Sequence, residues 1–482
     1  MGSIMSASTQ APSAARTALL TVGVLLASAA VLGAVSMAVA PAVAKLVAPT
    51  VIATVLFILF SILLWARLCG SIFGELGFIY LAWAVVYTAI PGFGLAAGTA
   101  DQSGPLALLL PDVEELTTHL WRHVLFIGSV AIGYLMARGR APLPMRLSLP
   151  DQNHSSDVMV TLLLGLIVVC IASLLLLSAP VTNYHEHYIR YDHLSWPVRK
   201  FVSVCVRLNI GFYSILLVLL FLNYERYRRL IPLVLIALCV HETTYSLGSR
   251  ILSLMILLQA AFLYHLLVRR VSLLRAAVFC ILLGAVFTAV EFIREAQGDL
   301  GAVQDRVADE GVKTAGEFGA VFLTGFHLYA ERAQGSIPPT EWPMFFNDFV
   351  SLVTFGDFTR WNPMEWYARN YFPDALVAPM TLSPIADSAI WGGELDLLFR
   401  GLVNGAFFAV IVRCFLRWRA RWWSLVIYAF CHATAIITLK YSVFYHLTPL
   451  IKTLLPALLV FALIRWISRT EPRPRDARVE ES

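Results

Sequence analysis

Three ionisable side chains are candidates for acid–base chemistry. His327 lies in the middle of an amphipathic stretch, where a histidine can act as a general base or be a partly buried structural residue. Glu242 and Asp387 lie near predicted membrane boundaries, where ionisable residues are functional candidates by default. The sequence alone does not rank these three residues as the base.

Further charged residues follow Asp387 along the chain. Glu394 comes about two helical turns later, so the two carboxylates could face one cavity. Asp396 and Arg400 are spaced i,i+4, which predicts a neutralising ion pair on one helix.

Three arginines could bind phosphate groups, because the planar guanidinium stays charged and matches phosphate oxygens. Arg250, Arg294 and Arg306 fall in parts of the chain that are otherwise poor in basic residues. Their structural alternatives are a membrane-interface anchor for Arg250 and a local ion pair with Glu291 for Arg294. Together they indicate an anionic ligand.

Aromatic side chains are frequent between Arg294 and Pro384, where carboxylates are interleaved with them. Aromatic faces stack on sugar rings, and the alternative is an aromatic belt at the membrane interface. The residues that we predict to contact sugar are Trp342, Trp361, Trp366 and Tyr367.

No metal or cofactor is expected. His185-Glu186-His187 lacks a third ligand at a telling spacing, and the seven cysteines form no CxxC motif. The sequence has no P-loop and no dinucleotide-binding fingerprint. The net charge of +5 does not indicate nucleic acid binding, because the basic residues are concentrated in short loops.

The elements that position these residues are predicted to be membrane-spanning helices. Of the 482 residues, 59% are hydrophobic and 14% are charged, and the mean hydropathy is +0.73. Apolar stretches of about twenty residues recur, each long enough to cross a bilayer. The sequence predicts an all-α polytopic membrane protein with about twelve spans, near 17–40, 46–66, 71–90, 119–137, 158–178, 202–222, 230–248, 251–268, 273–293, 388–412, 423–439 and 447–465. The first of these resembles a signal peptide, and we expect it to be an uncleaved span.

Alternate connections between the predicted spans are rich in arginine, which predicts their orientation. Both termini are expected on the cytoplasmic side, and the large loop outside. The predicted organisation is nine N-terminal spans in 1–293, an external loop in 294–387, three C-terminal spans in 388–465 and a cytoplasmic tail in 466–482. Within the loop, 314–333 and 342–358 have helical spacing and are predicted to be short helices at the outer leaflet.

This arrangement resembles the Wzy-type O-antigen and exopolysaccharide polymerases, a family of oligosaccharide repeat unit polymerases. The resemblance covers about residues 230–465. Three stretches carry it: Gly248-Ser249-Arg250 with the span that follows, the Arg294 junction into the large loop, and Ser383-Pro384-Ile385-Ala386-Asp387 with Trp391-Gly392, Gly401 and Gly405. Trp391 stands where the family usually has phenylalanine.

The resemblance implies a metal-independent, inverting glycosyl transfer at the outer face of a bacterial inner membrane. The donor would be a growing glycan on polyprenyl pyrophosphate, and the acceptor the next lipid-linked repeat unit. Arg250 and Arg294 would stabilise the departing pyrophosphate, and His327, Glu242 or Asp387 would take the acceptor proton. A flippase and a chain-length regulator of the same pathway would be partners.

Three other functions fit parts of this pattern. An O-antigen ligase shares many spans, a large external loop and arginine-rich phosphate chemistry. A more general lipid-linked-sugar glycosyltransferase could take its base from Asp112, Glu114 or Glu115. A flippase or transporter would be expected to show paired halves or broken spans at matching positions, which the sequence lacks.

Overall fold

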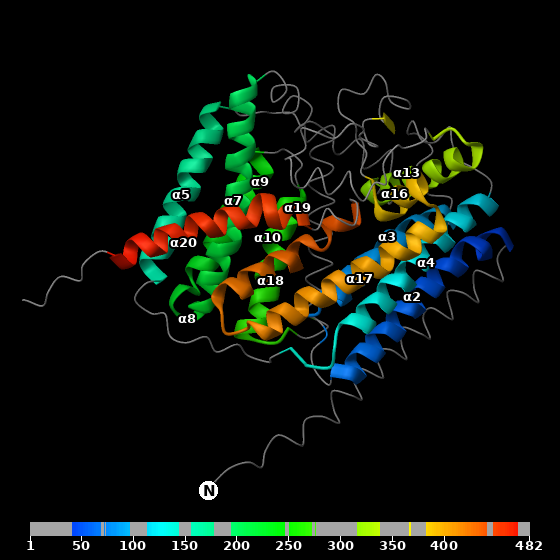
Figure 1. Ribbon diagram of the computed structural model, residues 1–482, viewed down its shortest axis with the longest axis horizontal. Coiled ribbons are helices and arrows are strands. Elements are labelled where there is room, and N and C mark those ends of the chain that lie inside the picture. The colour runs from blue at the N-terminus through cyan, green and yellow to red at the C-terminus, as the bar shows by residue number, and fades with distance from the viewer. Residues whose placement is uncertain are drawn as a thin grey trace, which may run out of the picture.

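The computed structural model describes residues 41–68, 72, 74–96, 113–143, 156–177, 194–245, 250–271, 275, 316–337, 366–367, 382–440 and 447–470. Within these ranges every regular element is helical (Figure 1). The first half contains α2 Pro41–Leu68, α3 Leu76–Ala96, α4 Val113–Ala137, α5 Ser156–Leu177, α7 Trp196–Leu222, α8 Tyr224–Tyr227, α9 Leu230–Tyr245, α10 Arg250–Leu263 and η2 Tyr264–Val268. The second half contains α13 Gly316–Gln334, α16 Pro384–Trp391, α17 Glu394–Arg417, α18 Trp422–Thr434, η3 Ile437–Lys440, α19 Leu447–Pro449, η5 Leu450–Leu454 and α20 Leu455–Thr470.

Seven described helices are long and apolar enough to cross a membrane, which agrees with the predicted class of protein. They are Ala44–Leu68, Leu76–Leu95, Val113–Ala137, Asp157–Leu174, Trp196–Leu222, Glu394–Arg417 and Leu447–Trp466. The spans predicted at 230–248 and 251–268 correspond to shorter apolar helices, Leu230–Glu242 and Leu252–Val268. The spans predicted at 17–40 and 273–293 lie outside the described residues, apart from Arg275.

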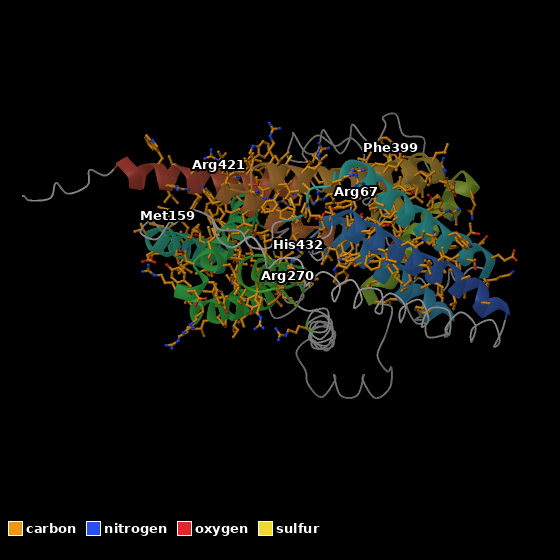
Figure 2. All side chains as sticks on the ribbon, turned by 90° about the horizontal axis from the view of Figure 1, so that it is seen from below. Arg67, Met159, Arg270, Phe399, Arg421 and His432 are labelled. Carbon is orange, nitrogen blue, oxygen red and sulfur yellow. The ribbon has the colours of Figure 1, made fainter. Side chains whose placement is uncertain are left out.

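The helices form two groups, which Figure 1 shows side by side. In the first group α2, α3, α4 and α17 pack together, and α13 and α16 lie at one end. In the second group α7 contacts α5, α10 and α20, and α9 packs on α10. Helix α18 touches α7 and α10 on one side and α3 and α17 on the other, and its His432 lies near the middle of the molecule in Figure 2.

Small residues bring α4 and α17 into backbone contact. A Cβ atom added to Gly133 would lie 2.2 Å from the Leu402 carbonyl oxygen, and one added to Gly405 would lie 2.1 Å from that of Val130. Such contacts require glycine, and small residues at helix crossings are typical of membrane bundles. The glycines therefore fix the closest helix pair of the first group.

A buried ion pair joins the start of α3 to the end of α4. Arg138 donates two hydrogen bonds of 2.7 Å, one to each carboxylate oxygen of Glu75. Both side chains are fully buried, and Tyr134 also donates to Glu75. Two parallel bonds of this kind are the strong, geometrically specific form of an arginine–carboxylate pair.

The span predicted at 388–412 is two helices rather than one. Helix α16 ends at Trp391, and α17 begins at Glu394. Between them Gly393 has a φ of 64°, a left-handed conformation that glycine adopts without steric cost. A hydropathy profile does not reveal this break, because the residues on both sides of it are largely apolar. Asp387 therefore lies on α16, separate from the long helix.

The helix predicted at 314–333 in the large loop corresponds to α13, which packs on α16, α3 and α4. Phe322 and Phe326 form a buried cluster with three leucines of the neighbouring spans, namely Leu46, Leu116 and Leu120. This cluster removes the apolar face of α13 from water and fixes the helix on the bundle. The stretch predicted at 342–358 lies outside the described residues.

Candidate functional site

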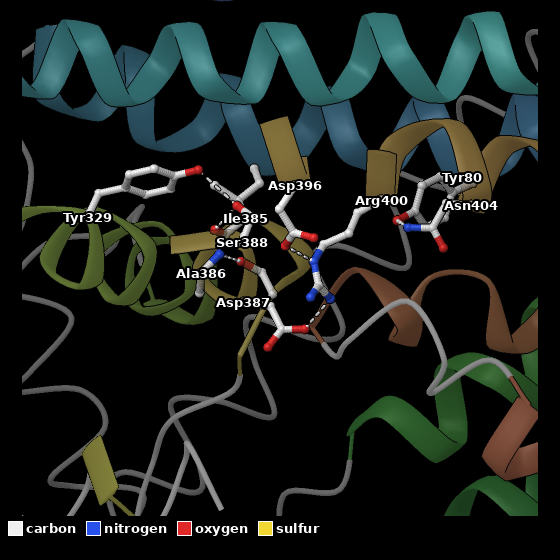
Figure 3. A network of polar contacts seen from close by, with 10 residues as sticks. Tyr80, Tyr329, Ile385, Ala386, Asp387, Ser388, Asp396, Arg400 and Asn404 are labelled. Carbon is white, nitrogen blue, oxygen red and sulfur yellow. Dashed lines mark hydrogen bonds and ion pairs between the residues drawn. The ribbon is translucent and has the colours of Figure 1, made fainter. Parts of the chain in front are cut away.

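A charged network joins α16 to the first turns of α17 (Figure 3). Arg400 donates from Nη1 to Oδ2 of Asp387 over 2.6 Å and from Nε to Asp396. The local pair with Asp396 is the one that the i,i+4 spacing predicted. Asp387 is fully buried, and its carboxylate is held in place by a nearly buried guanidinium.

A second set of contacts fastens α13 to the same helices. The Tyr329 hydroxyl lies 2.8 Å from the Ser388 hydroxyl, and Arg332 donates to the Ala389 carbonyl oxygen over 3.0 Å. Burial raises the pKa of Tyr329 to about 12, so the phenol is neutral at ordinary pH. These contacts fix the register of α13 against α16.

Arg122 of α4 closes this side of the site. Its guanidinium lies 3.8 Å from the centre of the Tyr329 ring, and its Nε donates to Glu394 of α17 over 2.9 Å. The Glu394 side chain is about half exposed. A cation over an aromatic face and beside a carboxylate is stabilised from both sides, and Arg122 thus links α4, α13 and α17.

His327 lies on α13 between two polar partners. Its Nδ1 is 2.8 Å from the Tyr367 hydroxyl, and its Nε2 is 3.5 Å from Oε1 of Glu331. Burial lowers the pKa of His327, and the Glu331 carboxylate partly opposes this. At neutral pH the imidazole is therefore uncharged and able to accept a proton.

A pair of buried histidines on α4 lies beneath α13, and the sequence analysis did not single them out. His119 is fully buried, and its Nε2 is 3.1 Å from the Phe322 carbonyl oxygen. His123, one turn later, has its Nδ1 3.2 Å from the Thr88 hydroxyl. Their i,i+4 spacing on a span would have been a usable signal, because histidines facing a bundle interior are rare and need polar partners.

The space beneath α13 is nearly filled. A cavity of about 20 Å³ lies there. Helices α3, α4, α13, α16 and η3 line it, together with Ser383. The lining side chains include Thr88, His123, Val321, Ile385 and Leu439. The cavity can hold about one water molecule and is too small for a sugar ring.

The structure brings some of the predicted site residues together and separates others. His327 and Tyr367 are in contact, and Asp387 lies on α16, which packs against α13. Trp366 is half-buried and packs against the hydrophobic core. Glu242 lies on α9 and Arg250 begins α10, both in the second helix group. Arg294, Arg306, Trp342 and Trp361 lie outside the described residues.

Asp387 and Glu394, whose spacing would allow them to face one cavity, take part in different ion pairs. Asp387 is buried against Arg400, whereas the half-exposed Glu394 pairs with Arg122. The break at Gly392 and Gly393 separates the helices that carry them. No group of three or more His, Cys, Asp or Glu side chains in the described ranges is arranged to hold a metal ion.

A comparison of the chain with protein-family models, with curated proteins and with solved structures finds no match.

Proposed function

We propose that this chain polymerises lipid-linked oligosaccharide repeat units at the outer face of a bacterial inner membrane. The reaction would transfer a growing glycan from polyprenyl pyrophosphate to a hydroxyl group of the next lipid-linked unit, with inversion and without a metal. The membrane-spanning helices and the sequence motifs described above support this function. A ligase acting on the same lipid-linked glycan is the nearest alternative.

The observation that carries the proposal is the arrangement of His327. The residue lies on α13, within the loop that we predict to be external, and is neutral at ordinary pH because of burial. Tyr367 and Glu331 lie beside its two ring nitrogens. A neutral imidazole oriented by a carboxylate is the arrangement that general-base catalysis requires. We assign to His327 the removal of the proton from the acceptor hydroxyl, which would take the place of the Tyr367 hydroxyl at Nδ1 while the Nε2–H group faces Glu331.

The other two candidates suit this role less well. Asp387 is fully buried and bound to Arg400, so it would position the guanidinium rather than meet a sugar. Glu242 lies on α9, which packs mainly on α10 in the second helix group. Only His327 combines a neutral basic nitrogen with a place on the loop helix.

The leaving pyrophosphate needs fixed positive charge, because negative charge develops on it as the glycosidic bond breaks. We assign this role to Arg250, Arg294 and Arg306, of which Arg250 is the first residue of α10. In the expected result, Arg250→Ala abolishes long-chain glycan while the amount of protein is unchanged. Normal long-chain glycan in this variant would contradict the assignment.

A glycan profile of a deletion strain tests the reaction class. A polymerase deletion leaves single repeat units attached to their final lipid, which is the expected result. Polymer that accumulates unattached would instead indicate a ligase, and lipid-linked units trapped on the cytoplasmic side would indicate a flippase. Each of the last two outcomes would overturn the proposal.

A matched pair of histidine variants tests the base. His327→Gln should lower the rate of chain extension about 10²- to 10⁴-fold, the usual contribution of a positioned general base. The control is His265→Gln, because His265 lies in η2 and accepts a hydrogen bond from the Val271 amide, away from α13. Equal rates in the two variants at equal protein levels would remove His327 from the mechanism.

A further inference from the structure

Three carboxyl side chains are buried in the described part of the chain, and they differ in their counter-charges. Glu75 is bound by Arg138 and Asp387 by Arg400. Glu242 is 5% exposed, yet no arginine or lysine of the described ranges forms an ion pair with it. Its ion-pair partner there is His241, whose Nε2 is 3.9 Å from Oε1 of Glu242.

The described groups around Glu242 come from three helices, and none of them carries a fixed positive charge. The Tyr213 hydroxyl of α7 lies beside the Glu242 carboxyl, although outside strict hydrogen-bond geometry. Besides His241, the titratable groups that the described helices place near this pair are Cys239 on α9 and Cys170 on α5. Thiols and a phenol are neutral at ordinary pH, so none of them offsets a negative charge on Glu242.

An unsatisfied amide lies on the same face of α7. Asn209 precedes Tyr213 by four residues, so the two side chains are neighbours on the helix surface. Asn209 is 2% exposed, and neither its Oδ1 nor its Nδ2 has a hydrogen-bond partner in the residues that the structure describes. An amide buried in this way is destabilising unless something else supplies its hydrogen bonds.

Burial of Glu242 without a fixed counter-charge from the described helices has a direct chemical consequence. An ionised carboxylate in an apolar interior is strongly destabilised, and the group takes up a proton instead. The neutral acid can exchange that proton only if a polar partner reaches it. Asn209 offers both a donor and an acceptor for such a partner, as a water molecule requires.

We propose that Asn209, Tyr213 and Glu242 form an intramembrane proton-binding site between α5, α7 and α9. Glu242 carries the exchangeable proton, and Asn209 and Tyr213 supply hydrogen bonds to the ionised carboxylate and to the water that brings or removes the proton. This site goes beyond the proposed glycosyl transfer, because Glu242 exchanges its proton with water rather than with a sugar hydroxyl.

A hydrophobic carbodiimide such as dicyclohexylcarbodiimide tests the proposal on the intact protein in detergent. A protonated carboxyl adds across a C=N bond of this reagent, with its proton passing to nitrogen, and the adduct rearranges to a stable N-acylurea. A carboxylate that stays ionised against an arginine does not react in this way. Glu75 and Asp387 are therefore internal controls on the same molecule.

The labelled residues are identified by peptide mass spectrometry near neutral pH and over a series of higher pH values. We expect Glu242 to be labelled at least about tenfold more than Glu75 or Asp387. A tenfold ratio of protonated fractions corresponds to a shift of about one unit between two titration midpoints. Labelling of Glu242 should decline as the pH rises. Equal labelling of the three residues, or none at Glu242, would overturn the proposal.

Two variants locate the site more closely. Glu242→Gln should remove the labelled peptide. Tyr213→Phe should raise the pH midpoint of labelling at Glu242 by about one unit, because it removes a hydroxyl that stabilises the ionised form. An unchanged midpoint in Tyr213→Phe would show that Tyr213 does not belong to the site. This labelling assay does not depend on glycan synthesis, so its outcome is separate from that of the proposed function.

Discussion

The two helix groups handle buried charge in opposite ways. In the first group Glu75 and Asp387 are each bound by an arginine. Among the described residues, Glu242 in the second group has a histidine at 3.9 Å and no arginine or lysine. A buried carboxylate with a well-oriented arginine remains ionised and acts as a fixed joint between helices. A buried carboxyl without one is a titrating group. Charge therefore fixes the shape of the first group and can change in the second.

The same contrast appears in the packing. Around the candidate site, α4, α13, α16 and α17 are connected by ion pairs and by glycines at backbone contacts. On α7 in the second group, both amide atoms of Asn209 lack partners within the described ranges. Unpartnered buried atoms also occur in the first group, such as Nη1 of Arg138 and Nδ1 of His119, but each of these side chains keeps another hydrogen bond. A side chain whose polar atoms all lack partners marks a place that can admit a ligand or water.

The largest effect that we expect comes from breaking a fixed pair. Arg138→Met leaves Glu75 buried without its counter-charge and should lower the free energy of unfolding by about 3–5 kcal/mol. The double variant Arg138→Met/Glu75→Leu should recover most of this loss, since both charges are then absent. Thermal unfolding in detergent measures both. If Arg138→Met is as stable as the original chain, the pair is not a structural joint.

A smaller loss is expected from the helix contact between α4 and α17. Gly405→Ala places a methyl group 2.1 Å from the Val130 carbonyl oxygen, so the helices must separate, at a cost of about 1–3 kcal/mol. Gly165→Ala on α5 is the matched control, because nothing lies within 4 Å of its added Cβ. This control should be neutral or slightly stabilising. Similar effects at both glycines would contradict the tight crossing in the first group.

Local features of this structure were predictable from the sequence, and distant pairings were not. The Asp396–Arg400 pair and the helix around His327 follow from residue spacing along one helix. The Arg122–Glu394 pair joins residues 272 positions apart, which no local pattern indicates. The break at Gly392 and Gly393 was missed because a hydropathy average does not register two residues with special backbone geometry.

The candidate site shows the same division. The sequence identified His327 and Asp387 as ionisable residues in unusual places, but it could not show that one has Tyr367 at hydrogen-bond distance and the other is buried against Arg400. The sequence also indicated Glu242, as an ionisable residue near a predicted membrane boundary. Only the structure separates it from Asp387, because counter-charge is a property of tertiary contacts.

Removing the unsatisfied amide tests the second helix group. Asn209→Leu keeps the side-chain shape and takes away two buried polar atoms without partners in the described ranges. We expect the free energy of unfolding to rise by about 1 kcal/mol, because a water molecule that binds the amide only while it exchanges the Glu242 proton does not offset the desolvation cost. The same assay as for Arg138→Met measures it. A clear loss of stability would mean that Asn209 has a structural partner, and the contrast between the two groups would fail.

The smallest effect that we expect is the pH dependence of the site helix α13. Burial lowers the pKa of His327 in the folded protein, so the unfolded chain takes up a proton on this residue first as the pH falls. The contribution of His327 to the free energy of unfolding is complete above its pKa in the unfolded chain, about 6.5. This contribution is lost as the pH drops from there towards the pKa in the folded protein, by at most about 1.4 kcal/mol per pH unit. Thermal unfolding between about pH 7.5 and about pH 5.5 measures the loss. His327→Gln lacks this titration, so the original chain should lose more stability than the variant over this range. A larger loss in the variant would mean that His327 binds its proton more tightly when α13 is docked, which is the opposite of what its burial predicts.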